Sequence, residues 1–131
     1  MQIGGFVYMI IKVDFNSEEA LYMQLRNQII LGIACSDIKD GDSLPSVRQL
    51  ADNIGINMHT VNKAYAVLRE EGFIRLDRRR GAIIAVSMDK LRALRETEEA
   101  LHILLAAASC KGITQSEIHA LVDDIYAKYG R

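Results

Sequence analysis

The 131-residue chain has one proline, no tryptophan and two cysteines, and its charges nearly balance at a formal net charge of −1. Cys35 and Cys110 lie far apart without CxxC spacing, which favours free thiols over a disulfide scaffold. No apolar run approaches the roughly 18 residues that span a bilayer, and the short run from Phe6 to Ile11 has no basic residues before it, unlike a signal peptide. With 50% hydrophobic and 25% charged residues, we expect a globular cytoplasmic protein.

The charge is unevenly distributed along the chain. Residues 41–86 carry seven Lys or Arg against five Asp or Glu, residues 1–40 carry three against five, and residues 87–131 carry six against seven. The sequence pI of about 6.3 by itself argues against nucleic acid. The Debye length is only about 8 Å at physiological salt, so the basic cluster around Arg78 outweighs the overall charge in docking to a polyanion.

The first 35 residues predict a strand and a helix. Residues 8–15 are apolar and rich in β-branched side chains, which is typical of a short strand. Asn16 and Glu19 have capping-box spacing, so we expect them to begin a helix. Apolar residues then recur at every fourth position from Leu21 to about Cys35, which indicates one buried helix face.

Two further helices follow, separated by a tight turn. Ser46 and Gln49 form the capping box of the first, and Gly55 ends it. Asn57 is the expected N-cap of the second helix, which stops at Gly72. Two helices joined by a few residues that include a glycine have the spacing of a helix-turn-helix.

After the second of these helices, the hydrophobic period changes to that of strands. Residues 73–76 and 82–86 predict a hairpin whose polar tip, residues 77–81, is basic. A helix-turn-helix followed by such a hairpin is a winged helix-turn-helix. We therefore predict a mainly α fold with a small β-hairpin, in which residues 8–86 form a DNA-binding domain.

The second helix of such a motif enters the major groove and reads base edges near its N-terminus. Asn62 can pair with an adenine edge, Thr60 and His59 with a base or a phosphate, and Lys63 with a phosphate. The basic tip can enter a minor groove or contact the backbone. In the alternative interpretation, Asn57 is only a cap, the polar side chains are a solvated face, and the arginines form a soluble loop.

Three segments resemble the GntR family of bacterial transcription regulators: Leu44-Pro-Ser-Val-Arg-Gln-Leu-Ala51, Thr60-Val-Asn-Lys-Ala-Tyr65 and Leu68-Arg-Glu-Glu-Gly-Phe-Ile74. The short chain is similar to the YtrA-like subgroup, and the likeness covers about residues 14–86. It implies a homodimeric regulator, usually a repressor, that binds double-stranded DNA at a pseudo-palindromic operator. It also implies that Arg48 contacts the DNA backbone and that Gly81 is the wing glycine.

The sequence departs from the family in the recognition helix and in the wing, where Ala82-Ile83 follow Gly81 in place of the family's Thr or Ser and then Phe. Many members have arginine or proline where this chain has Met58, arginine where it has Asn62, and glycine where it has Arg79. The operator sequence therefore does not carry over. The expected DNA-binding residues are Arg48, Asn57, Met58, His59, Thr60, Asn62, Lys63, Arg78, Arg79, Arg80 and Gly81.

Two more helices are expected in residues 87–131. Ser87 should cap the first, and Thr114 with Glu117 should cap the second. The first has a near-heptad apolar stripe, which indicates a dimerisation region or, alternatively, packing within the chain. The candidates for the dimer contact are Leu94, Leu101, Leu105 and Ala108. The residues that the last helix is expected to bury are Ile118, Leu121, Val122, Ile125 and Tyr129.

Other functional classes find little support. There is no P-loop, GxSxG, HExxH or GxGxxG motif, so we expect no enzyme. The spacing of His102, Cys110 and His119 matches no familiar metal site, so we expect no metal and no cofactor. Residues 87–131 are too few for the ligand domains of larger GntR proteins, and a small-molecule effector stays unknown. The remaining alternative is a winged-helix module that binds protein instead of DNA.

Overall fold

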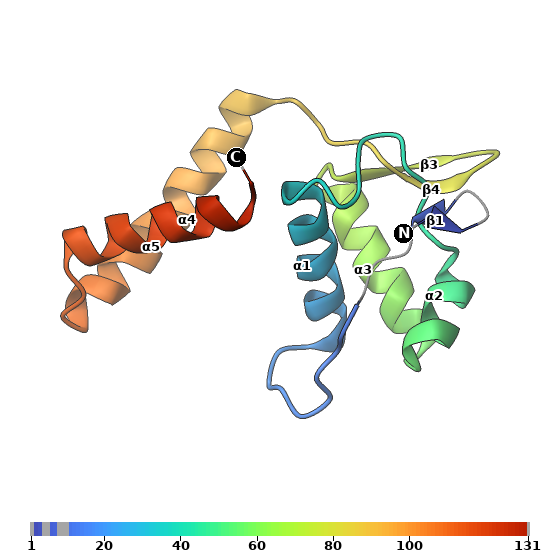
Figure 1. The fold of residues 1–131 in the computed structure, drawn as a ribbon, viewed down its shortest axis with the longest axis horizontal. Helices are drawn as coiled ribbons and strands as arrows, with labels where there is room; N and C mark the ends of the chain where they lie inside the picture. The colour runs from blue at the N-terminus through green and yellow to red at the C-terminus, as the bar shows by residue number, and fades with distance from the viewer. Residues whose placement is uncertain (1, 4–5, 8–10, 131) are drawn as a thin grey trace. The chain divides into compact units, whose positions relative to one another are not determined.

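The computed structural model describes residues 2–3, 6–7 and 11–130, which fall into two compact units, Met1–Ser87 and Met88–Arg131. The chain is mainly α with a small hairpin, as predicted (Figure 1). The elements of the first unit are β1 (Gln2–Ile3), β2 (Phe6–Val7), α1 (Leu21–Ala34), α2 (Val47–Ile54), α3 (Met58–Glu70), β3 (Ile74–Asp77) and β4 (Gly81–Ile84). The second unit consists of α4 (Lys90–Cys110) and α5 (Gln115–Lys128).

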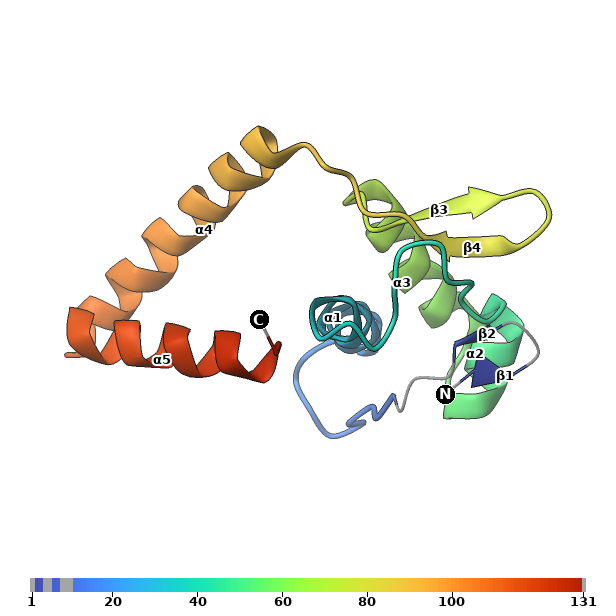
Figure 2. The ribbon, with the colours of Figure 1, turned by 45° about the horizontal axis from the view of Figure 1, so that its top comes forward.

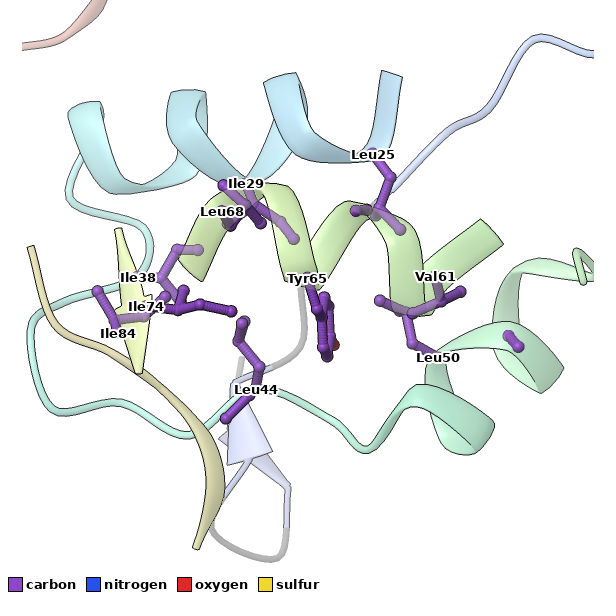
Figure 3. Close-up of a cluster of buried hydrophobic side chains, with 13 residues drawn as sticks. Leu25, Ile29, Ile38, Leu44, Leu50, Val61, Tyr65, Leu68, Ile74 and Ile84 are labelled. Atoms are coloured by element: carbon purple, nitrogen blue, oxygen red, sulfur yellow. The ribbon is translucent and has the colours of Figure 1, made fainter. Parts of the chain in front are cut away.

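The core of the first unit forms around α3, which lies between α1 and α2 (Figure 1). Val61 and Leu68 of α3 are fully buried against side chains from α1, α2 and the hairpin (Figure 3). The other large side chains of this core are Leu25, Ile29, Ile38, Leu44, Leu50, Tyr65, Ile74 and Ile84. Burying one face of α3 in this way leaves its opposite face open to solvent.

The predicted ends of α2 and α3 are confirmed. The Ser46 hydroxyl accepts from the Gln49 amide at 3.1 Å, and the Gln49 side chain accepts from the Ser46 amide at 3.0 Å. Gly55 ends α2 with φ 76°, a left-handed conformation that favours glycine. The Asn57 side chain accepts from the His59 amide at 2.7 Å and so caps α3.

The hairpin is held to the helices along one edge. β3 and β4 are antiparallel, with Ile74 opposite Ile84 and Asp77 opposite Gly81. On the other edge of β4, the Leu44 amide donates to Ala82 O and the Ile84 amide to Asp42 O, both at 2.8 Å. The segment that leads into α2 therefore fixes the hairpin beside the helix-turn-helix.

The strand expected at residues 8–15 is not found where the chain is described. Residues 8–10 lie outside the described residues, and residues 11–15 form no strand. The Lys12 amide instead donates to Gln28 Oε1 at 2.9 Å, and the Asp14 amide to Gln24 Oε1 at 2.8 Å. Two side-chain amides of α1 thus take the place of a neighbouring strand.

Two predicted helix caps, Asn16 and Ser87, are wrong because the backbone amides of these residues are hydrogen-bonded to other parts of the chain. The Asn16 amide donates to Asp14 Oδ1 at 2.9 Å in a turn, and α1 begins only after Ala20, which provides no side-chain cap. The Ser87 amide donates to Gly72 O at 2.7 Å. Because Ser87 is held to the first unit, α4 begins later, with Asp89 as its cap.

In the second unit, the Thr114 and Glu117 capping box is confirmed, with bonds of 3.0 and 3.1 Å. The predicted burial of the last helix is wrong: Leu121, Val122 and Ile125 are 51%, 41% and 44% exposed. Ile118 and Tyr129 are half-buried. The two helices diverge from their connecting turn (Figure 2). Neither helix has a buried residue, so the apolar side chains of both stay at least partly exposed.

Candidate nucleic-acid interface

The N-terminal half of α3 presents polar side chains to solvent. Asn57, Met58, His59, Asn62 and Lys63 are exposed, Thr60 is half-buried and Val61 is buried. The buried residues follow the helical period, so the side chains between them point away from the core. This arrangement leaves amide, imidazole and ammonium groups on a convex helical surface of the width that a major groove accepts.

Arg48 is exposed in the first turn of α2, and two contacts fix that turn. One is the capping box at Ser46. The other is the hydroxyl of Tyr65 in α3, which donates to Pro45 O at 2.8 Å. Burial raises the pKa of the Tyr65 phenol well above its ordinary value, so the phenol keeps its proton and remains a donor. The start of α2 is therefore positioned by the helix beside it.

We call β3, β4 and their connecting turn the wing. The turn, residues 78–80, is organised by Asp77, whose Oδ1 accepts from the amides of Arg79 at 2.8 Å and Arg80 at 3.1 Å. These two backbone bonds, that of Arg79 first, hold the pKa of the Asp77 carboxyl below its ordinary value. Gly81 follows with φ 74°, as expected for glycine after a three-residue hairpin loop.

The three arginines of the wing tip differ in their contacts, although the sequence analysis treated them alike. Arg80 Nη1 donates to Gly41 O at 3.2 Å, and Nη2 lies 3.9 Å from Asp77 Oδ2. Arg78 and Arg79 are exposed, and their side chains make no hydrogen bond or ion pair within the described residues. Two of the three cations are thus free to meet an anion.

The sequence analysis did not identify Tyr22 as part of this surface. The Lys63 ammonium lies over the Tyr22 ring, 4.1 Å from its centroid. The two residues belong to different helices, α3 and α1, and no spacing rule links them. Nothing in the helical pattern of the sequence therefore pointed to this contact.

The expected dimer residues lie on the second unit. Leu94, Leu101 and Leu105 of α4 are 60%, 43% and 37% exposed, and Ala108 is half-buried. Their spacing of seven, four and three residues places them on one face of the helix. Neither α4 nor α5 has a buried residue, so this unit has an extensive apolar surface without a core.

Residues 2–3, 6–7 and 11–130 contain neither a metal-binding cluster nor a membrane-spanning helix. No three His, Cys, Asp or Glu side chains gather there as a metal site would require. None of the helices in that part of the chain combines the length and apolar character needed to cross a membrane. The candidate site consists of the exposed face of α3, Arg48 and the wing.

Comparison with known proteins connects this site to a family. The model of the bacterial regulatory proteins of the gntR family matches residues 17–84. The HTH-type transcriptional repressor YtrA of Bacillus subtilis (strain 168) is 32% identical over 120 residues, which cover 89% of this chain and 92% of YtrA. The match includes α2, α3 and the wing, which form the candidate site.

Two solved structures share the fold. A transcriptional antiterminator from Listeria monocytogenes EGD-e has a TM-score of 0.80 and 28% identity, over 89% of this chain and 90% of that one. YtrA from Sulfolobus acidocaldarius, a GntR-family transcription factor, has a TM-score of 0.59 and 40% identity, over 72% and 99%. The chain therefore belongs to the GntR family of DNA-binding bacterial transcription regulators and is YtrA-like.

Proposed function

We propose that this protein is a sequence-specific repressor that binds a pseudo-palindromic operator as a homodimer. The observation that carries the proposal is the open N-terminal face of α3, flanked by Arg48 and the wing. The Bacillus subtilis relative YtrA is a transcriptional repressor, and we extend that role to this chain as part of the proposal. The protein would act in the cytoplasm, where bacterial DNA lies.

The side chains divide into base-reading and phosphate-binding groups. Asn62 carries an amide that pairs bidentately with an adenine edge, and His59 and Thr60 contact a base or a phosphate. Met58 offers an apolar contact to a thymine methyl group. The cations that bind phosphates are Arg48, Lys63, Arg78, Arg79 and Arg80. Part of the Arg80 guanidinium is already bonded to Gly41 O. Asn57 caps α3 and keeps its NH₂ group for the DNA, and Gly81 allows a close approach of the wing backbone.

The homodimer is supported by the apolar surface of the second unit. A helix pair without a buried residue gains no stability from its own core, so its leucines need a partner. A second copy supplies an identical apolar face around Leu101 and Leu105, which suits a two-fold interface. Two-fold symmetry would place two α3 helices about one DNA turn apart and make the operator palindromic.

A randomised-site selection with the full chain, followed by fluorescence anisotropy over a range of salt concentrations, tests this function. We expect selected duplexes with two inverted half-sites. The affinity should fall with salt at a log–log slope of about −0.9 for each phosphate neutralised. A chain that enriches no sequence and shows no salt-dependent binding would contradict the proposal and favour the winged-helix module that binds protein.

A further inference from the structure

Lys63 differs from the other cations of the first unit in how it is held. Its Nζ lies 4.1 Å from the centroid of the Tyr22 ring. The ring is half-buried and packs against the hydrophobic core, so it is a fixed support. The electron-rich face of an aromatic ring attracts an ammonium group. The Tyr22 ring of α1 therefore holds the charge of Lys63, a residue of α3, toward α1.

The ring holds this charge without neutralising it. Arg26 is paired with Glu71 through two bonds of 2.8 and 3.0 Å, and Arg80 gives one of its donors to Gly41 O. The Lys63 ammonium makes no hydrogen bond or ion pair within the described part of the chain. An ammonium has three donors, and the contact with the ring face uses none as a hydrogen bond. The donors that point away from the ring remain available for phosphate oxygens.

The direction in which Lys63 is held determines which phosphate it can reach. α3 lies between α1 and α2 (Figure 1). The Lys63 ammonium lies over the Tyr22 ring of α1, whereas Arg48 belongs to the first turn of α2. A helix in the major groove has a phosphate backbone on each side. The two cations are therefore suited to opposite walls of one groove.

We propose that Tyr22 is a positioning residue for DNA binding, which holds the Lys63 ammonium ready for a phosphate on the α1 side of the groove, across from the strand that Arg48 contacts. This inference rests on the proposed binding of DNA by α3. Tyr22 touches no DNA in this account and acts only through Lys63.

A double-mutant cycle on the full chain tests the proposal. The variants are Tyr22→Leu, which keeps an apolar side chain but removes the ring, Lys63→Gln, and both together, with Tyr22→Phe as the matched control. The probe is a labelled duplex of unselected sequence, because a phosphate contact is independent of sequence. Tyr22→Leu should weaken binding about two- to fivefold per protomer, whereas Tyr22→Phe should bind like the unaltered chain. Lys63→Gln should flatten the salt slope by about 0.9 per protomer.

The diagnostic result is the coupling. In the Lys63→Gln background, Tyr22→Leu should cause no further loss. A loss that persists in that background, a Tyr22→Phe variant as weak as Tyr22→Leu, or an unchanged salt slope in Lys63→Gln would overturn the proposal. If the unaltered chain binds no duplex, the proposed DNA binding itself is refuted. Failure of the Tyr22 proposal and failure of the proposed function are therefore distinguishable.

A second measurement needs no substitution and serves if Tyr22→Leu fails to fold. The ring should shift the NMR signals of the Lys63 ε-methylene protons upfield in the free protein, and these signals should move when the duplex is added. Lys63 ε-methylene signals at ordinary lysine chemical shifts, or signals that do not shift when the duplex is added, would overturn the proposal.

Discussion

The wing makes a quantitative prediction for the variant Arg78→Ala/Arg79→Ala. Both side chains are exposed and make no polar contact within the described residues, so each can neutralise one phosphate. A dimer has two wings and would lose four such contacts, which should flatten the log–log salt slope by about 3.6. Between about 50 and 200 mM salt, the affinity of the variant should then fall about 150-fold less than that of the unaltered chain.

The assay is fluorescence anisotropy with a duplex of unselected sequence, and Arg92→Ala/Arg95→Ala in α4 is the control because it removes the same charge outside the first unit. Arg80→Ala should change the slope less than Arg79→Ala, because Arg80 is bonded to Gly41 O. The reasoning would be refuted by a double variant with an unchanged slope, or by a control that flattens the slope equally.

Four further predictions concern the interface, base reading and local stability. Leu101→Arg places a charge on the apolar face of α4 and should reduce the sedimenting species to a single chain. Asn62→Ala should lose roughly 1–3 kcal/mol of discrimination at one position per half-site, measured by randomised-site selection. Ser46→Ala removes the cap of α2 and should lower the free energy of unfolding in urea by about 1 kcal/mol. Asp77 has a lowered pKa in the folded protein, so the stability that it contributes is present above its unfolded-state pKa and is lost as the pH falls through the folded value. The amide NMR signals of Arg79 and Arg80 should therefore shift together, with a midpoint below the ordinary aspartate value of about 3.9.

A specific outcome would contradict each of these predictions. A Leu101→Arg variant that still sediments as a dimer would place the interface elsewhere, and an unchanged base preference in Asn62→Ala would remove its reading role. Unaltered stability of Ser46→Ala would show that the cap is dispensable. A titration midpoint at or above the ordinary aspartate range would contradict the bonding assigned to Asp77.

The features that the sequence predicted well are those that neighbouring residues determine. The capping box of Ser46 and Gln49, the left-handed Gly55 and the cap at Asn57 each join groups a few residues apart, so local chemistry suffices. The winged helix-turn-helix followed from the order of these elements. The exposed face of α3 followed from the period of its buried residues.

The features that the sequence did not predict depend on distant parts of the chain. Ser87 has a good capping side chain, but its amide is bonded to Gly72 O, and the helix starts later. The Lys63 contact with Tyr22 and the Arg80 bond to Gly41 join residues about 40 positions apart. Spacing rules for helices and strands do not reach that far.

The exposure of the last helix has a different cause. An apolar stripe specifies that a face needs covering, but not whether the same chain or a second copy covers it. In the single chain, Leu121 and Ile125 stay exposed. The periodicity was therefore sufficient to find the helix and insufficient to name its partner.

The central claim is that the open face of α3 and the wing together bind DNA. An NMR titration of the ¹⁵N-labelled protein with a duplex from the randomised-site selection tests it most directly. The largest shifts should fall on Asn57 to Lys63, Arg48 and residues 78–81, with small shifts along α5. Shifts concentrated on α5, and an unperturbed α3, would contradict the account.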